Sequence, residues 1–367
     1  MVDSKENASN SVVIADLQLL LASIMFGFGF VVQRAAMVDG LGPLTFNALR
    51  YVVSSILMMS FIPFWMQRKS KDEKSNSTND LEQLLDNTGN HVAPSPSSSR
   101  NDISNKSSKL SGYFWFMNPM ILINYLPPKY SIHVWSALLG IMNFAASTLG
   151  QIGIQYVSAS ASAFITGFYV VFTPVLIYLV PSLGEKPRTK TWLAVLGSML
   201  GLFIISDSSY NDIRLGHGEI LTLLSALFWS LHIFVTEKAV QSHDAVELTM
   251  NEMNVLAVGC SIFAILLEEK EWEFTHLLSN WVAIVAMGLM ECIGFTLSAL
   301  GQMHAPPAHV ALILATEAVF ATIGGFTFLH ESFTTSESIG CLLMMASMLI
   351  AKSDEYMGST DDAKSKQ

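Results

Sequence analysis

Three ionisable residues stand out among those in the apolar stretches of this 367-residue chain: Glu317, Glu291 and Arg50. A charge at the centre of a bilayer costs about 2.5–3.5 kcal/mol even on insertion scales, so such a residue is either used or paired. Glu317 and Glu291 can each bind a proton or a cationic substrate group, form a structural salt bridge, or stay protonated and hydrogen-bonded. Arg50 lies early in its stretch, where its side chain can reach the interface. A structural role and substrate contact are both open for it.

Further polar residues recur at helical spacing in four apolar segments. These stripes are Asn143, Ser147, Gln151 and Gln155; Ser225, Trp229, His232 and Thr236; Glu291, Ser298 and Gln302; and Asn47, Arg50 and Ser54. One stripe is explained by hydrogen bonds between helices, but four together favour a polar central cavity. For His232 and His309, packing is a simpler interpretation than proton relay. The candidate residues for substrate or proton binding are Glu317, Glu291, Arg50, Asn143, Gln151, Tyr169, Trp229 and His232.

The composition indicates a polytopic membrane protein. Hydrophobic residues make up 51% of the chain and charged residues only 14%, against roughly 25% in soluble domains. The mean hydropathy is +0.43. About 20 apolar residues cross a bilayer as a helix. Ten segments fit this pattern: 14–33, 44–66, 132–155, 159–181, 191–206, 219–236, 248–267, 278–302, 306–329 and 336–351. The fifth, seventh and tenth have the shortest uncharged cores.

The ten segments form two related sets of five. Residues 16–36 align without gaps on 219–239, and residues 169–172 align on 317–320, with an acidic residue following each, Glu185 and Glu331. An odd number of crossings inverts the second copy, as in many transporters. We therefore predict an all-α membrane protein with ten transmembrane helices in two inverted five-helix repeats, residues 14–206 and 219–351.

The distribution of basic residues predicts the orientation. With the N-terminus inside, the inner segments hold 13 Lys and Arg near the membrane and the outer segments hold three. Basic residues are enriched on the cytoplasmic side. The tails 1–13 and 352–367 should both be cytoplasmic, and the first apolar run should be retained as a helix rather than removed as a signal peptide.

Residues 67–131 interrupt the first repeat. The part from 71 to 109 is rich in Ser, Asn and Asp, which is typical of disorder. Residues 113–126 are aromatic and apolar but short, so we expect them to lie in the inner interface rather than to cross the bilayer.

Pro174 should kink the fourth segment. Cys260, Cys292 and Cys341 are expected to be free cysteines inside apolar segments.

The order of several short motifs resembles the drug/metabolite transporter superfamily, EamA type. The resemblance covers nearly the whole chain except 67–131 and the tails. It rests on Phe26-Gly27 with Phe30-Val31, Gly42-Pro43-Leu44-Thr45-Phe46 leading to Arg50, Gly153 with 159–164, Gly184-Glu185-Lys186 before Trp192, Ala226-Leu227-Phe228-Trp229, and Glu317-Ala318-Val319-Phe320. It implies ten helices, inverted repeats and a central cavity open alternately to each side. The chain departs from the family pattern in two places. Ala318 stands where the family often has proline, so a proline kink in the ninth helix is not expected from the sequence. The inner loop, residues 67–131, is longer than in compact members of the family.

The favoured function is transport of small metabolites by alternating access, with proton coupling left open. A carrier of organic phosphates or nucleotide sugars is the alternative, but such anions need several cationic groups and the segments offer only Arg50. A non-transporting scaffold or sensor is a third reading, disfavoured by the retained carboxylates. We expect no enzyme activity, cofactor, metal or nucleic acid. The expected partners are a small-molecule substrate and the lipid bilayer. A homodimer, and the choice between plasma and intracellular membrane, stay open.

Overall fold

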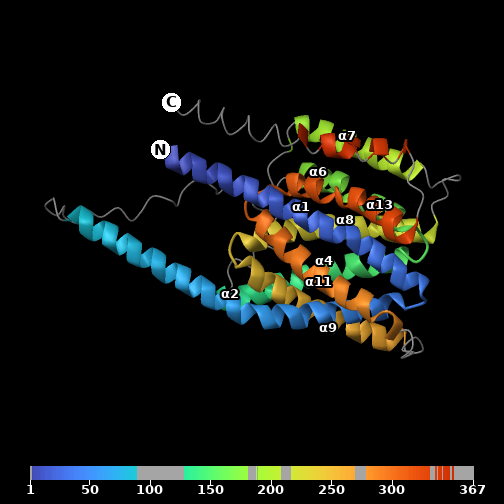
Figure 1. The fold of residues 1–367 in the computed structure, drawn as a ribbon, viewed down its shortest axis with the longest axis horizontal. Coiled ribbons are helices and arrows are strands. Elements are labelled where there is room, and N and C mark those ends of the chain that lie inside the picture. The colour runs from blue at the N-terminus through green and yellow to red at the C-terminus, as the bar shows by residue number, and fades with distance from the viewer. Residues whose placement is uncertain are drawn as a thin grey trace, which may run out of the picture. The chain divides into compact units, whose positions relative to one another are not determined.

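The computed structural model describes residues 2–88, 128–180, 187, 189–207, 216–268, 278–330, 335–336, 338–340, 342–347 and 349–350. The expected interfacial segment 113–126 lies outside these residues, as do Glu185, Glu331 and Cys341. The helices are α1 (Val2–Val38), α2 (Pro43–Thr88), α4 (Pro128–Gly153), α5 (Ala159–Thr166), α6 (Tyr169–Leu179), α7 (Thr189–Asp207), α8 (His217–Val240), α9 (Ala245–Leu267), α11 (Trp281–Gln302), α12 (Pro307–Leu314) and α13 (Glu317–Leu329) (Figure 1).

Eight stretches of helix are long and apolar enough to cross a membrane. They are Ser11–Val38, Pro43–Lys71, Tyr130–Gly153, Ala159–Leu179, His217–Val240, Ala245–Leu267, Trp281–Gln302 and Pro307–Leu329. The two other predicted segments correspond to α7 and to the shorter apolar helix Ser338–Ser347. The described residues are thus helical without strands, as expected of a multi-pass membrane protein.

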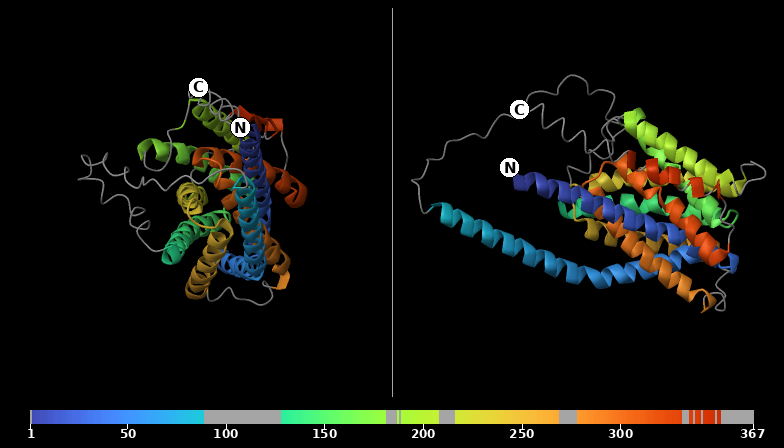
Figure 2. Two further views of the ribbon diagram at one scale, coloured as in Figure 1. Left: turned by 90° about the vertical axis from the view of Figure 1, so that its left-hand side faces the viewer. Right: turned by 45° about the horizontal axis from the view of Figure 1, so that its top comes forward.

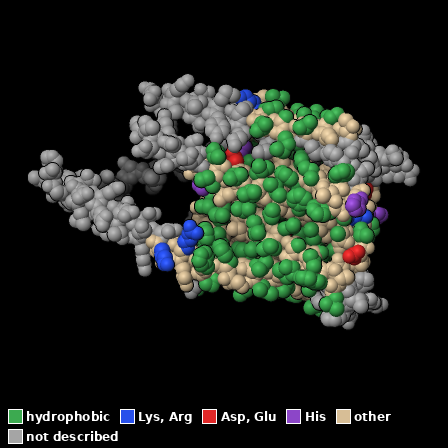
Figure 3. Space-filling view, in the orientation of Figure 1, with side chains coloured by type: hydrophobic (Ala, Val, Ile, Leu, Met, Phe, Trp, Pro, Cys, Tyr) green, Lys and Arg blue, Asp and Glu red, His purple; other side chains and the backbone are tan. Residues whose placement is uncertain are grey.

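Two units divide the chain: Met1–Met58 with Ile132–Gln367, and Met59–Ser131. The first holds the bundle of helices, in which α1 packs along both α11 and α13 (Figures 1 and 2). The face of this bundle seen in Figure 3 is covered mainly by apolar side chains, as lipid contact requires. In the second unit, the C-terminal part of α2 carries ring contacts of Phe61 with Phe64 and Trp65, at 6.2 and 6.3 Å between centroids.

The helix ends differ from the sequence prediction in two places. α1 begins at Val2, within the expected polar tail, and α2 continues to Thr88, so residues 71–88 are helical rather than disordered. Composition led to the wrong prediction for 71–88, because it counted polar residues. The stretch from 79 to 87 instead combines Leu, Glu and Gln, which favour helix, and contains no Gly or Pro.

The fourth and ninth segments are each divided into two helices. α5 and α12 both have eight residues, and each is followed by a tight turn in which N–H groups bond to carbonyls three residues back. The second halves then start at Tyr169 and Glu317. Pro174 lies within α6, and the break in the fourth segment comes before it, on the side where a proline disturbs a helix. The ninth segment breaks at the matching point with Ala318 and no proline nearby, so proline is not the common cause.

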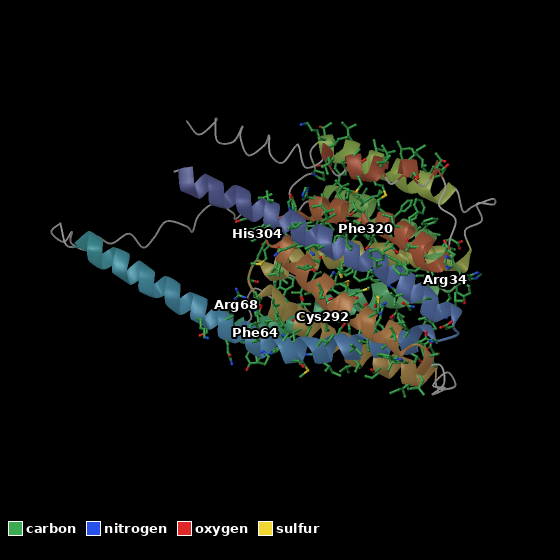
Figure 4. The ribbon with its side chains drawn as sticks, in the orientation of Figure 1. Arg34, Phe64, Arg68, Cys292, His304 and Phe320 are labelled. Atoms are coloured by element: carbon green, nitrogen blue, oxygen red, sulfur yellow. The ribbon has the colours of Figure 1, made fainter. Side chains whose placement is uncertain are left out.

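Close contacts hold α1 against its neighbours. A Cβ atom on Gly27 would lie 2.5 Å from Phe320 Cβ and 2.6 Å from the carbonyl oxygen of Glu317, so only glycine allows this approach of α1 to α13. Nearer the C-terminal end of α1, Arg34 Nη1 donates to the backbone carbonyls of Ile154 and Gln155, at 2.9 and 2.8 Å. Arg34 and His304 lie at opposite ends of the bundle in Figure 4.

Candidate functional site

A cavity of about 90 Å³ lies inside the first unit, and side chains from both halves of the chain line it. Its lining comes from α1, α2, α4, α5, α6, α8, α11, α12 and α13. The polar lining residues are Gln33, Arg50, Tyr51, Ser147, Gln151, Thr166, Tyr169, Ser225, Trp229, His232, Glu291, Ser298, Gln302 and Glu317. The polar stripes on α4, α8 and α11 thus face one common space, as helical spacing predicts.

Glu317 and Tyr169 meet across this cavity. Tyr169 Oη donates to Glu317 Oε1 at 3.0 Å, and the two side chains are buried, at 3% and 5% relative exposure of the residues. Each is the first residue after the break in its segment, so the two interrupted segments touch at equivalent points. A carboxylate at the first position of a helix also faces the partial positive charge of free N–H groups. Among the described residues, Glu317 has no cationic partner.

Arg50 and Glu291 form an ion pair, one of the possibilities that the sequence analysis allowed for both residues. Arg50 Nε lies 3.2 Å from Glu291 Oε1, with both side chains 3% exposed. The guanidinium also lies 4.9 Å from the centroid of the Tyr51 ring and 5.6 Å from that of Phe46, within the range of cation–π contacts. A cation therefore compensates Glu291, whereas none does so for Glu317 in the part of the chain that the structure describes.

A chain of hydrogen bonds extends from this ion pair to α8. Arg50 Nη2 donates to Tyr51 Oη at 3.4 Å, and Tyr51 Oη donates to Asn143 Oδ1 at 3.3 Å. Asn143 Nδ2 donates to Glu252 Oε1 at 2.7 Å, and His232 Nε2 lies 2.8 Å from the same oxygen. The network therefore joins α2, α4, α9 and α8 through buried groups, which is a costly arrangement unless each member is satisfied.

Several buried polar atoms at the cavity are not satisfied by protein. Within the described residues, Arg50 Nη1, Glu291 Oε2 and both amide atoms of Gln151 have no hydrogen-bond partner. Gln151 is fully buried and Arg50 is 2% exposed. A buried donor or acceptor left unpaired costs about 1–3 kcal/mol, more if charged. Two donors and two acceptors around one cavity therefore point to a bound polar solute or water that completes them.

An aromatic wall borders the same space. The rings of Trp229 and Phe295 are stacked at 5.8 Å between centroids, and Phe26 lies 5.1 Å from Phe295. His232 packs edge-on against Trp229 and Phe295, at 5.6 and 5.9 Å. The cavity thus offers an apolar surface next to its charged groups, as small-molecule sites usually do.

Seven of the eight candidate residues line the cavity. The exception is Asn143, which lies behind Tyr51 and connects it to Glu252. Asn47 and Ser54 make interhelical hydrogen bonds instead, to the carbonyls of Ser147 and Gly288, as the simpler interpretation of a polar stripe expects.

The sequence prediction missed Glu252, which is 3% exposed, and the lining residue Tyr51. The signal for Glu252 was its position inside the apolar segment 248–267. The structure also pairs His309 Nε2 with Asp16 Oδ1 at 3.0 Å, away from the cavity lining. Cys260 and Cys292 are free cysteines. Within the described residues there is no group of three or more His, Cys, Asp or Glu residues arranged to hold a metal ion.

Comparisons with known proteins agree with this architecture. The profile of the EamA-like transporter family matches residues 13–83 and 216–352, more than half of the chain. A WAT1-related protein of Arabidopsis thaliana is 24% identical over 234 residues, covering 60% of this chain and 68% of the relative. An uncharacterized transporter of Archaeoglobus fulgidus is 25% identical over 212 residues, covering 58% and 66%. One solved crystal structure superposes with a TM-score of 0.61 at 12% identity, covering 94% of this chain and 96% of the other, which shows a shared fold.

Proposed function

This chain belongs to the EamA-like transporter family and is an integral, multi-pass membrane protein, and from this premise we propose that it carries small cationic or zwitterionic metabolites by alternating access. The observation that supports this most directly is Glu317. It is a buried carboxylate without a cationic partner among the described residues, it lies at a helix break, and it lines the cavity. Interrupted helices that meet at a cavity are where such carriers bind their solutes.

The proposed site has two poles. Glu317 and the unpaired Glu291 Oε2 would bind the positive group of a solute, and Arg50 Nη1 with the Gln151 amide would bind a carboxylate or hydroxyl. The wall of Trp229 would contact an apolar part of the solute. A carrier of organic phosphates is the weaker alternative, because Arg50 is the only Lys or Arg in the described lining and Glu291 already compensates it.

A solute screen in reconstituted vesicles tests this proposal. Radiolabelled lysine, choline and phenylalanine represent cations and zwitterions, and glucose 6-phosphate represents the alternative. We expect uptake of at least one of the first three above protein-free vesicles, and its loss in Glu317→Gln. Uptake of glucose 6-phosphate alone would instead favour the phosphate carrier. No uptake of any probe, by protein that remains folded, would count against transport of these solute classes.

We also propose that the membrane domain has ten crossings in two inverted repeats, with both ends cytoplasmic. The basic-residue distribution and the matching breaks before Tyr169 and Glu317 support this arrangement. Exposed Asp39 and His304 follow α1 and α11, and the proposed topology places them on opposite sides. Single cysteines at these positions, in a background with Cys260, Cys292 and Cys341 replaced, should react with an impermeant reagent from opposite sides of sealed vesicles. Reaction of both from one side would contradict the topology.

A further inference from the structure

Helices α2 and α9 have matching surroundings in the two halves of the chain. Residues 49–58 and 251–260 show the same order of buried, half-buried and exposed positions over all ten residues. The two helices run in opposite directions, because the Glu268 carboxylate at the end of α9 accepts the N–H groups of Leu44 and Thr45 at the start of α2, at 2.9 and 2.7 Å. Matching positions on the two helices therefore lie toward opposite ends of the bundle.

The helices that pack against α2 and α9 correspond as well. A Cβ atom on Gly288 of α11 would lie 2.8 Å from Val53 Cβ, and one on Gly140 of α4 would lie 2.8 Å from Val255 Cβ. The two valines occupy the same place in the matching stretches of α2 and α9. The α2–α11 pair of helices therefore corresponds to the α9–α4 pair.

The polar partners on the two helix pairs match too. Arg50 Nε lies 3.2 Å from Glu291 Oε1 between α2 and α11, and Asn143 Nδ2 donates to Glu252 Oε1 at 2.7 Å between α4 and α9. Asn143 and Glu291 each follow the packing glycine of their helix by three residues. Each helix pair thus holds a buried carboxylate at this position, and the first pair holds a guanidinium in addition.

The cavity reaches only one of these two helix pairs. Its lining includes what we call the Arg50 side, formed by Arg50, Tyr51, Met287 and Glu291. The matching positions form the Glu252 side, which is outside the described lining and at most 3% exposed: Glu252, Met253, Leu139 and Asn143. By contrast, Tyr169 and Glu317, which also match each other, line the cavity together. The two halves of the chain are therefore in different arrangements around one cavity.

We propose that the Glu252 side is a second solute subsite, which lines the cavity when the two halves exchange their arrangements. In carriers built from two related halves, movement of one half against the other transfers access across the membrane. The Arg50 side would then close, as the α2–α11 pair adopts the arrangement that α9–α4 has here. The inference rests on the alternating access of the proposed function and adds the residues that the solute meets after the change.

The two subsites favour different groups of a solute. In the present arrangement, the carboxylate of a zwitterion can pair with Arg50 Nη1, which has no hydrogen-bond partner among the described residues. In the exchanged arrangement, that carboxylate would face Glu252, which repels it and attracts an ammonium group. Glu317 lines the cavity in both arrangements, because it takes the place of Tyr169. Lysine should therefore bind in both arrangements, and phenylalanine more weakly at the Glu252 side.

Thiol accessibility tests the exchange in the full-length protein. The background variant has the three cysteines of the chain replaced, namely Cys260, Cys292 and Cys341. Single cysteines at Met253 and Leu139 then report on the Glu252 side, and one at Met287 reports on the Arg50 side. An impermeant trimethylammonium methanethiosulfonate is added to either face of sealed vesicles. With the proposed topology, Met287→Cys should react from the outer face, and Met253→Cys and Leu139→Cys from the cytoplasmic face.

Leu256→Cys is the matched control. Leu256 lies one turn after Glu252 on α9 and is fully buried, but its counterpart Ser54 does not line the cavity. This thiol should therefore stay unreactive from both faces. Reaction of Leu256→Cys as fast as Met253→Cys would indicate general opening of α9 and would overturn the proposal. Unreactive thiols at both Met253 and Leu139, in folded protein whose Met287→Cys reacts, would overturn it as well.

Protection by solute tests the role of Glu252 itself. Lysine should slow the cytoplasmic reaction of Met253→Cys, and Glu252→Gln should raise the half-protecting concentration by about tenfold or more, because a charge-assisted hydrogen bond is lost. An unchanged concentration would contradict the subsite. If vesicles take up none of the probe solutes but the thiols react as expected, the proposed function fails and the exchange of the two sides stands. Uptake together with unreactive Met253 and Leu139 thiols is the opposite result.

Discussion

Two groups of buried carboxylates in this protein differ in how their charge is balanced. Glu291 and Glu252 belong to a network in which Arg50 supplies a positive partner to Glu291 at 3.2 Å and a ring nitrogen of His232 lies 2.8 Å from Glu252. Among the described residues, Glu317, across the same cavity, has the hydroxyl of Tyr169 at 3.0 Å as its partner and no cation. A buried charge without a counter-charge is costly to keep. The difference is consistent with a network around Arg50 that holds the helices together, and it supports our proposal that Glu317 binds a positive group of a solute.

The largest effect on stability should follow from breaking the Arg50–Glu291 pair. Glu291→Gln leaves a buried guanidinium without its counter-charge, so we expect a loss of about 3–5 kcal/mol. The double variant Arg50→Met with Glu291→Leu should recover much of this loss, because it removes both charges and keeps the volume. Thermal unfolding of purified protein in detergent measures both variants. Equal stability of Glu291→Gln and the wild type would show that the pair is not structural.

How far the sequence could predict this site depends on the kind of information needed. Helical spacing was enough to identify the faces of α4, α8 and α11 that line the cavity, because residues four apart share a face. It could not identify partners, since Arg50 and Glu291 are far apart in the chain and Arg50 could equally have paired with Glu317. Glu252 was overlooked because it lies one turn from the start of its apolar segment, where acids are usually interfacial.

For the fold, too, the hydrophobic pattern of the sequence predicts some features and not others. Eight predicted segments coincide with helices able to cross the membrane, because hydropathy reports burial in lipid. The breaks before Tyr169 and Glu317 were not predicted at their true positions, since no proline or glycine marks both of them. At both breaks, N–H groups bond to carbonyls three residues back instead of four. The ten-crossing inverted repeat stays a prediction, and α7 and Ser338–Ser347 are its shortest members.

A smaller effect is expected from Tyr169→Phe. This change removes the hydroxyl that donates to Glu317 and keeps the ring, so it should lower the free energy of unfolding by about 1–2 kcal/mol. Tyr178→Phe is a suitable control, because Tyr178 lies on the same helix α6 and is 66% exposed. Thermal unfolding of the two variants side by side isolates the buried hydrogen bond. An equal, negligible change in both would mean that Tyr169 does not stabilise the Glu317 carboxyl.

The smallest effect on stability, and the sharpest test of the comparison, belongs to Glu317→Gln. Glutamine keeps the size of the side chain and can still accept from Tyr169, while the variant removes an ionisable carboxyl that has no cationic partner among the described residues. Stability should therefore change by less than about 1 kcal/mol, in contrast to Glu291→Gln, because no ion pair is broken. Uptake of a cationic probe should nevertheless fall by about tenfold or more, since charge-assisted hydrogen bonds contribute about 1.5–3 kcal/mol. Wild-type transport together with a clearly lowered melting temperature would reverse the assignment and make Glu317 the structural carboxylate.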